Sequence, residues 1–94
     1  MNNTRKYLPI GSVILVKGGK QKLMITGYMG ENYEKDWPIF DYIACLYPQG
    51  IVSSKSNLLF NHVDIEEICF LGYSDDEQKQ YIEFLNKNSE MESE

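Results

Sequence analysis

The side chains best suited to chemistry in this sequence are one histidine and two cysteines. A catalytic thiol needs an adjacent base, and nothing in the chain spacing places His62 beside Cys45 or Cys69. Because its neighbours Asn61 and Asp64 are turn formers, we expect His62 to stabilise a turn rather than to act as a general base. Both thiols lie in apolar segments and are expected to be buried and reduced. A disulfide between Cys45 and Cys69 is the alternative that the sequence leaves open.

Two further patterns have the composition of ligand sites but not the geometry. Asp64, Glu66 and Glu67, together with Asp41, carry the oxygen ligands that divalent cations prefer. On a strand, however, Glu66 and Glu67 point to opposite faces and cannot readily share an ion. Residues 17–20, Lys-Gly-Gly-Lys, lack the spacing and the following helix of a phosphate-binding loop. We therefore predict no metal, no cofactor and no catalytic residue, and we expect a protein that is not an enzyme.

Aromatic side chains are concentrated in one part of the chain. Six tyrosine, tryptophan and phenylalanine residues lie between positions 28 and 47. Tyrosine and tryptophan are frequent in protein interfaces because they offer a large apolar area with a polar tip. Phe40, Tyr42 and Tyr47 are expected to be mainly structural. The candidate partner-binding residues are Tyr28, Tyr33, Trp37, Tyr81 and Phe84.

The elements that must position these residues follow from apolar runs and turn signals. Apolar stretches predict strands at 12–17, 22–28, 40–47, 51–54 and 65–71. The pair Gly18-Gly19 is expected to join the first two strands in a hairpin, because glycine adopts positive φ without steric cost. Residues 29–39 are predicted to form a mixed polar and aromatic loop. Residues 47–50, Tyr-Pro-Gln-Gly, fit a type I turn, and residues 61–64 fit one helical turn.

A helix is predicted to begin at Ser74. Ser74 and Glu77 have the spacing of a capping box, and acidic residues between them suit the positive end of the helix dipole. Apolar residues at spacings of three and four then form a stripe. The members of this stripe are Tyr81, Ile82, Phe84 and Leu85.

Together these elements predict a mainly β (α+β) fold. We expect a small five-stranded antiparallel barrel or bent sheet with one C-terminal helix that covers an open end. A flat sandwich with the helix across one face is the alternative. The predicted organisation is a flexible lead at 1–7, a single domain at 8–87 and a disordered acidic tail at 88–94.

The net charge of −5 is confined to one end of the chain. Residues 75–94 hold seven acids and two lysines, while residues 1–74 are neutral. This distribution disfavours nucleic-acid binding, which depends on clustered lysine and arginine. It suits either a solubilising helix face or a basic protein partner. No run approaches the roughly 20 apolar residues of a membrane span, so we expect a cytoplasmic protein without membrane insertion.

Three blocks of the sequence together resemble a known family. They are the run from Leu8 through Gly27, the run from Phe40 through Gly50, and the run from Phe60 through Tyr73. Their order and spacing are similar to those of the family called domain of unknown function 4176, over about residues 7–80. No catalytic residue is assigned in that family, so the resemblance carries none to this chain.

The resemblance also implies a setting for the protein. Members come from Gram-positive bacteria, and their genes tend to lie beside those for type VII secretion substrates with an LXG toxin domain. This implies a non-enzymatic, protein-binding accessory factor, such as a chaperone or targeting factor for the secreted toxin. An immunity protein that neutralises a toxin domain is one alternative, and a nucleic-acid-binding small barrel is another. The oligomeric state stays open.

Overall fold

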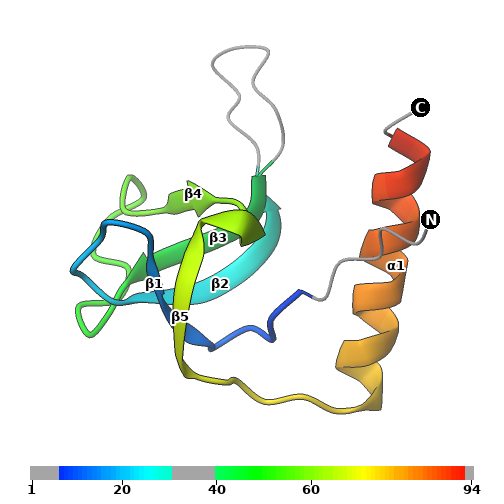
Figure 1. Cartoon of the computed structure of the whole chain (residues 1–94), viewed down its shortest axis with the longest axis horizontal. Helices are drawn as coiled ribbons and strands as arrows, with labels where there is room; N and C mark the ends of the chain where they lie inside the picture. The colour runs from blue at the N-terminus through cyan, green and yellow to red at the C-terminus, as the bar shows by residue number, and fades with distance from the viewer. Residues whose placement is uncertain (1–6, 31–39, 93–94) are drawn as a thin grey trace.

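The protein folds as one strongly bent antiparallel sheet with a single long helix beside it (Figure 1). The structure is a computed structural model that describes residues 7–30 and 40–92. The sheet has five strands in the order β4-β3-β2-β1-β5. Their bounds are β1 (Val13–Val16), β2 (Leu23–Gly30), β3 (Phe40–Leu46), β4 (Leu58–Phe60) and β5 (Ile65–Phe70). The 3-10 helix η1 (His62–Asp64) precedes β5, and the helix α1 (Asp76–Glu92) follows it.

The predicted mainly β fold with a C-terminal helix is confirmed. Every neighbouring pair of strands runs antiparallel. The terminal strands of the order, β4 and β5, do not pair with each other, so the sheet is bent and open rather than a closed barrel. β5 pairs with β1 along one edge, and its other edge is open. An open strand edge leaves backbone hydrogen-bonding groups available.

The hairpin between β1 and β2 is also confirmed, although its connection is longer than a two-residue turn. Pairing between these strands is limited to Val13 with Met24 and Ile14 with Leu23. Beyond Ile14, β1 continues to pair with β5 on its other side. Gly18 adopts a φ of 78° in the connection, which a side chain would disfavour.

The fourth strand was predicted in the wrong place. Residues 51–54 form no strand, and β4 lies instead at Leu58–Phe60, where it pairs with β3. The turn at 47–50 ends as expected in Gly50, which has a φ of 79°. The aliphatic pair Ile51 and Val52 is exposed, whereas Phe60 stacks on Tyr42 with ring centroids 5.2 Å apart. Burial of Phe60, rather than local β-propensity, therefore decides which segment joins the sheet.

The hydrophobic core lies between the bent sheet, the N-terminal segment and α1. Tyr7 and Leu8 are both buried in it, so the core includes Tyr7, the last residue of the predicted lead at 1–7. Leu85 is the buried residue that α1 contributes, and Ile82 packs partly against the same cluster. The buried members of the core are Tyr7, Leu8, Ile14, Leu23, Ile25, Tyr42, Ala44, Phe60 and Leu85.

The cap of α1 lies one residue later than predicted. Asp75, not Ser74, caps α1: its Oδ1 accepts a hydrogen bond of 2.9 Å from the Gln78 backbone amide. The Ser74 hydroxyl instead donates to Gln78 Oε1 at 2.8 Å. Either residue type can cap a helix, so the sequence alone did not separate the two. The helix also continues to Glu92, past Lys87, where the sequence predicted a disordered acidic tail from residue 88. Good helix-forming residues such as glutamate and methionine favour this continuation.

Candidate protein-binding surface

Three of the five predicted partner-binding residues come together in the structure. Tyr28 from β2 lies 6.1 Å from Tyr81 of α1, measured between ring centroids. Tyr81 in turn stacks on Phe84 at 5.9 Å with an angle of 27° between the rings. We call Tyr28, Tyr81 and Phe84 the aromatic row. The other two predicted residues, Tyr33 and Trp37, lie outside the described residues.

The aromatic row is anchored at its sheet end and open to solvent at its helix end. Tyr28 is half-buried, and its hydroxyl donates a hydrogen bond of 2.5 Å to the Leu8 carbonyl. Its ring packs edge-on against Tyr7 with centroids 5.5 Å apart. Burial raises the pKa of the Tyr28 hydroxyl above its ordinary value. By contrast, Tyr81 and Phe84 are 50% and 55% exposed.

The apolar stripe predicted for the helix is therefore divided between two directions. Leu85 and Ile82 face the core, whereas Tyr81 and Phe84 extend the aromatic row along the outside of α1. Residues three and four apart on a helix share a face. The apolar stripe of α1 is, however, wider than the surface of the N-terminal segment that could cover it. The surplus aromatic surface stays in contact with solvent.

A groove lies beside the aromatic row, between β2, the N-terminal segment and the start of α1. Tyr28 and Tyr81 line it together with Tyr73, which is 79% exposed. We call it the tyrosine groove. Among the residues that the structure describes, no lysine or arginine lines this groove. The lining residues are Ile10, Tyr28, Tyr73, Asp75, Glu77, Gln78 and Tyr81.

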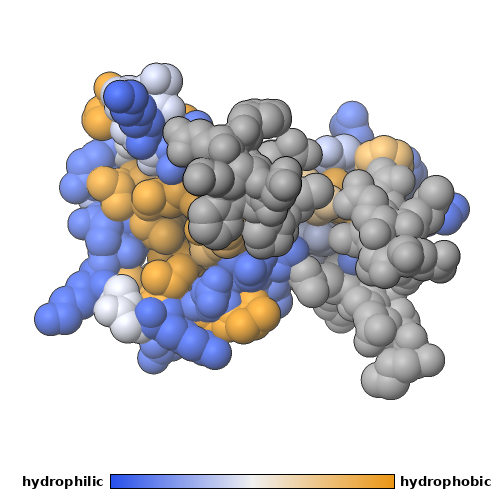
Figure 2. Space-filling view, turned by 90° about the horizontal axis from the view of Figure 1, so that it is seen from above, coloured by the Kyte–Doolittle hydropathy of each residue, from blue (hydrophilic) through white to orange (hydrophobic). Residues whose placement is uncertain are grey.

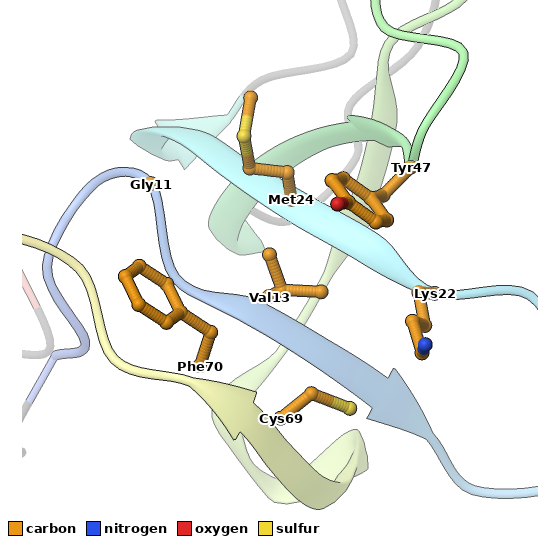
Figure 3. Close-up of a pocket in the computed structure, with 7 residues that line it drawn as sticks. All are labelled: Gly11, Val13, Lys22, Met24, Tyr47, Cys69 and Phe70. Atoms are coloured by element: carbon orange, nitrogen blue, oxygen red, sulfur yellow. The ribbon is translucent and has the colours of Figure 1, made fainter.

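A second pocket is lined by residues of β1, β2 and β5 and of the segments beside these strands (Figure 3). Val13 and Phe70 are direct partners in neighbouring strands, and both side chains line this pocket. The pairing then shifts, because Ile14 is opposite Ile68 and leaves Cys69 as an extra residue on β5. We refer to this site as the outer pocket. Its lining residues are Gly11, Val13, Lys22, Met24, Tyr47, Cys69 and Phe70.

The irregular pairing of β5 corrects one prediction about the cysteines. Both thiols are free, and Cys45 is buried as expected. Cys69, however, is exposed. It lies at a bulge on an edge strand, which has only β1 as a neighbour among the described strands, so an apolar sequence context was not sufficient to bury it.

Exposed apolar side chains extend from β5 into the connection before α1. These residues are Ile68, Phe70, Leu71 and Tyr73. Figure 2 shows that hydrophobic side chains also gather on the face seen there, with hydrophilic ones around them. The adjacent Glu66 and Glu67, which break the apolar alternation, were the available sequence signal that β5 is an edge strand.

The sole histidine lies in the predicted helical turn and contacts β3. His62 begins η1, and its backbone amide donates a hydrogen bond of 2.9 Å to Asp41 Oδ2. Its Nδ1 lies 2.7 Å from the Tyr42 hydroxyl. Asn61 and Asp64 form a capping box around the same turn. These contacts connect η1 to β3.

Among residues 7–30 and 40–92, no cluster of histidine, cysteine, aspartate and glutamate could hold a metal ion. Within the same part of the chain, no helix combines the length and the apolarity that crossing a membrane requires.

The fold and its surface define a small, open β-sheet domain with one helix and an exposed aromatic row. The chain belongs to the family described as domain of unknown function (DUF4176), whose sequence profile matches residues 7–81. The match includes the whole sheet and the start of α1, as far as Tyr81. No curated protein and no solved structure matches the chain.

Proposed function

We propose that this protein is a non-enzymatic, protein-binding accessory factor, a chaperone or targeting factor for a type VII secretion substrate with an LXG toxin domain. The observation that supports binding is the solvent-exposed aromatic row at the junction of β2 and α1. The secretion setting is what resemblance to the family implies. A cytoplasmic location before export fits this role.

The composition of the exposed surface favours a protein as the ligand. Hot spots of protein interfaces are rich in tyrosine and tryptophan, and each interface partner buries about 800 Å². The aromatic row lies next to Tyr73, and exposed Leu71 and Phe70 precede this residue in the chain. A partner that covers the row and this connection would contact both α1 and the end of β5.

Co-expression with an LXG toxin, taken from the gene neighbourhood that the family resemblance implies, tests this proposal. The tagged wild-type protein is expected to co-purify with the toxin, and deletion of its gene is expected to reduce toxin export. The double variant Tyr81→Ala/Phe84→Ala should capture at least roughly ten-fold less toxin, because it removes two candidate hot-spot residues.

Val52→Ala is the matched control for surface truncation. Val52 is exposed and lies in the connection between β3 and β4, so this variant should bind like the wild type. Absence of co-purification, combined with unchanged export after gene deletion, would contradict the proposal. Equal capture by the double variant and the wild type would show that the aromatic row is not the binding surface.

An immunity function is the second candidate, and the acidic charge of α1 favours it. An acidic surface can compete with phosphate for the basic active site of a nuclease toxin. Growth of cells that express the toxin domain separates the two functions. Protection by this protein without any effect on export would support immunity, whereas reduced export without protection would support targeting.

A further inference from the structure

The tyrosine groove has a distinct combination of aromatic faces and negative charge. Three tyrosines line it, and the Tyr28 ring is held in place by the hydrogen bond of its hydroxyl to Leu8. The rings of Tyr28 and Tyr81 are tilted by 44° relative to each other, so their faces do not cover one another in a parallel stack. Aromatic faces of this kind attract cations through their quadrupole.

The charged residues that line the groove within the described part of the chain are both acidic. They are Asp75 and Glu77 at the beginning of α1, and no lysine or arginine of residues 7–30 and 40–92 is among the lining residues. Asp75 already accepts a hydrogen bond from the helix backbone, so part of its charge serves to cap the helix. Glu77 is exposed in the first turn and is the carboxylate more available to a ligand.

The helix dipole does not reverse this charge. A helix N-terminus carries the equivalent of about half a positive elementary charge. The carboxylates of Asp75, Asp76 and Glu77 occupy the cap and first turn, so the formal charge there stays clearly negative. The groove therefore complements a positively charged side chain rather than an anion.

We propose that the tyrosine groove receives an arginine side chain of the protein partner, a step that rests on the proposed function. The planar guanidinium can stack on a tyrosine face and at the same time form two parallel hydrogen bonds with the Glu77 carboxylate. Lysine presents a compact, strongly hydrated charge and lacks this planar match. The segment that binds beside the aromatic row is thus a basic one, with an arginine at the groove.

Titration of the isotope-labelled full-length protein with two synthetic peptides tests the inference. The first probe is acetyl-Gly-Ser-Arg-Ser-Gly-amide, and the second carries citrulline, a neutral isostere, in place of arginine. The arginine peptide should produce saturable changes in the backbone amide resonances of Tyr73, Gln78 and Tyr81. The citrulline peptide should bind at least roughly five-fold more weakly, because it lacks the cation.

Two variants and one control locate the interaction. Glu77→Gln should weaken arginine-peptide binding roughly three-fold, and Tyr73→Ala roughly two- to five-fold. Tyr73 is largely exposed, so its truncation should leave the fold intact. Glu83→Gln makes the same chemical change at an exposed position of α1 that does not line the groove, and it should have no effect.

The outcomes separate this inference from the proposed function. Equal binding of the two peptides, no saturable change, or equal effects of Glu77→Gln and Glu83→Gln would overturn the arginine site. If the toxin nevertheless co-purifies, only the inference fails. If the arginine peptide binds as described but the toxin neither co-purifies nor depends on this protein for export, the groove is correct and the proposed function fails.

Discussion

Gly72 shows how a single residue without a side chain holds two distant segments together. Its backbone amide donates a hydrogen bond of 2.9 Å to the hydroxyl of Ser12, which is fully buried. A β-carbon at this position would overlap the carbonyl oxygen of Ile10 and lie 3.0 Å from the Ser12 nitrogen. Since both atoms belong to the backbone, neither can move aside as a flexible side chain would.

Gly72→Ala is therefore expected to lower the free energy of unfolding by about 2–4 kcal/mol. Urea denaturation monitored by circular dichroism measures this change. Gly27→Ala is the control, because its β-carbon would meet Cδ1 of Ile43 at 3.3 Å, a side-chain atom that can adjust. It should cost about 1 kcal/mol or less. Equal losses in the two variants would contradict the role of close backbone contact.

Tyr42 is the residue whose hydroxyl joins three parts of the fold. The side chain is fully buried in β3, and its oxygen accepts a hydrogen bond of 2.9 Å from the Leu8 amide. The same hydroxyl lies 2.7 Å from His62 Nδ1. Burial is the main cause that raises the pKa of Tyr42 well above its ordinary value of 10.0.

This raised pKa predicts how stability depends on alkaline pH. Below the ordinary tyrosine pKa, both folded and unfolded chains keep the Tyr42 proton, so its contribution to stability is fully present. Above pH about 10 the unfolded chain loses this proton first, and the free energy of unfolding falls as pH rises further. Urea midpoints measured from pH about 8 to about 11 should show the decrease. Tyr42→Phe should weaken the pH dependence and, near neutral pH, cost about 1–3 kcal/mol through its lost hydrogen bonds.

Tyr47→Phe is the corresponding control, since Tyr47 is exposed. Its stability near neutral pH should equal that of the wild type, and its alkaline dependence should be unchanged. A Tyr42→Phe protein with the same alkaline profile as the wild type would assign the pH dependence to other groups.

At the scale of elements, α1 depends on the capping interaction at its beginning. Asp75→Ala removes the acceptor for the Gln78 amide and should lower the free energy of unfolding by about 0.5–2 kcal/mol. Asp76→Ala removes a charge of the same sign in the first turn without removing this acceptor, and it should cost less. Urea denaturation of both variants distinguishes capping from charge alone. An equal loss would mean that the dipole interaction, not the cap, is decisive.

The strand β5 illustrates how position within a sheet changes the meaning of an apolar sequence. β1 pairs on both sides and buries Val13 and Ile14, whereas β5 pairs only with β1. Ile68, Cys69 and Phe70 therefore remain exposed despite their strand conformation. Glu66 and Glu67 add negative charge to this edge, which opposes pairing with a second, equally charged copy of β5.

At the scale of the whole molecule, a core residue and a residue of the proposed binding surface are adjacent in the same helix. Leu85 is 4% exposed and connects α1 to the core, whereas its neighbour Phe84 belongs to the open aromatic row. Leu85→Ala should lower the free energy of unfolding by about 2–4 kcal/mol, and Phe84→Ala should change it by less than about 0.5 kcal/mol. In the toxin capture assay, Phe84→Ala should reduce binding. A stable Leu85→Ala protein, or a destabilised Phe84→Ala protein, would show that the helix packs in another orientation.

Local patterns in the sequence were sufficient for most of the elements. Apolar runs between glycine and proline signals predicted four of the five strands, with both ends within two residues of the observed bounds. β3 and β5 are two examples. The helix and the turn at His62 also followed from nearby residues. β4 was missed because residues 51–54 and Leu58–Phe60 have similar β-propensity, and only contact with Tyr42 selects the latter.

The amino-acid sequence by itself determined the class of fold, the acidic end of the chain and the aromatic residues available for binding. Tertiary structure alone decided that Tyr28 meets Tyr81, that Tyr73 joins them in the groove, and that Cys69 is exposed on an open edge. The reason is physical: turns and helices depend on neighbours within a few residues. Contacts between distant segments depend on which side chains of the whole chain are buried together in one small core.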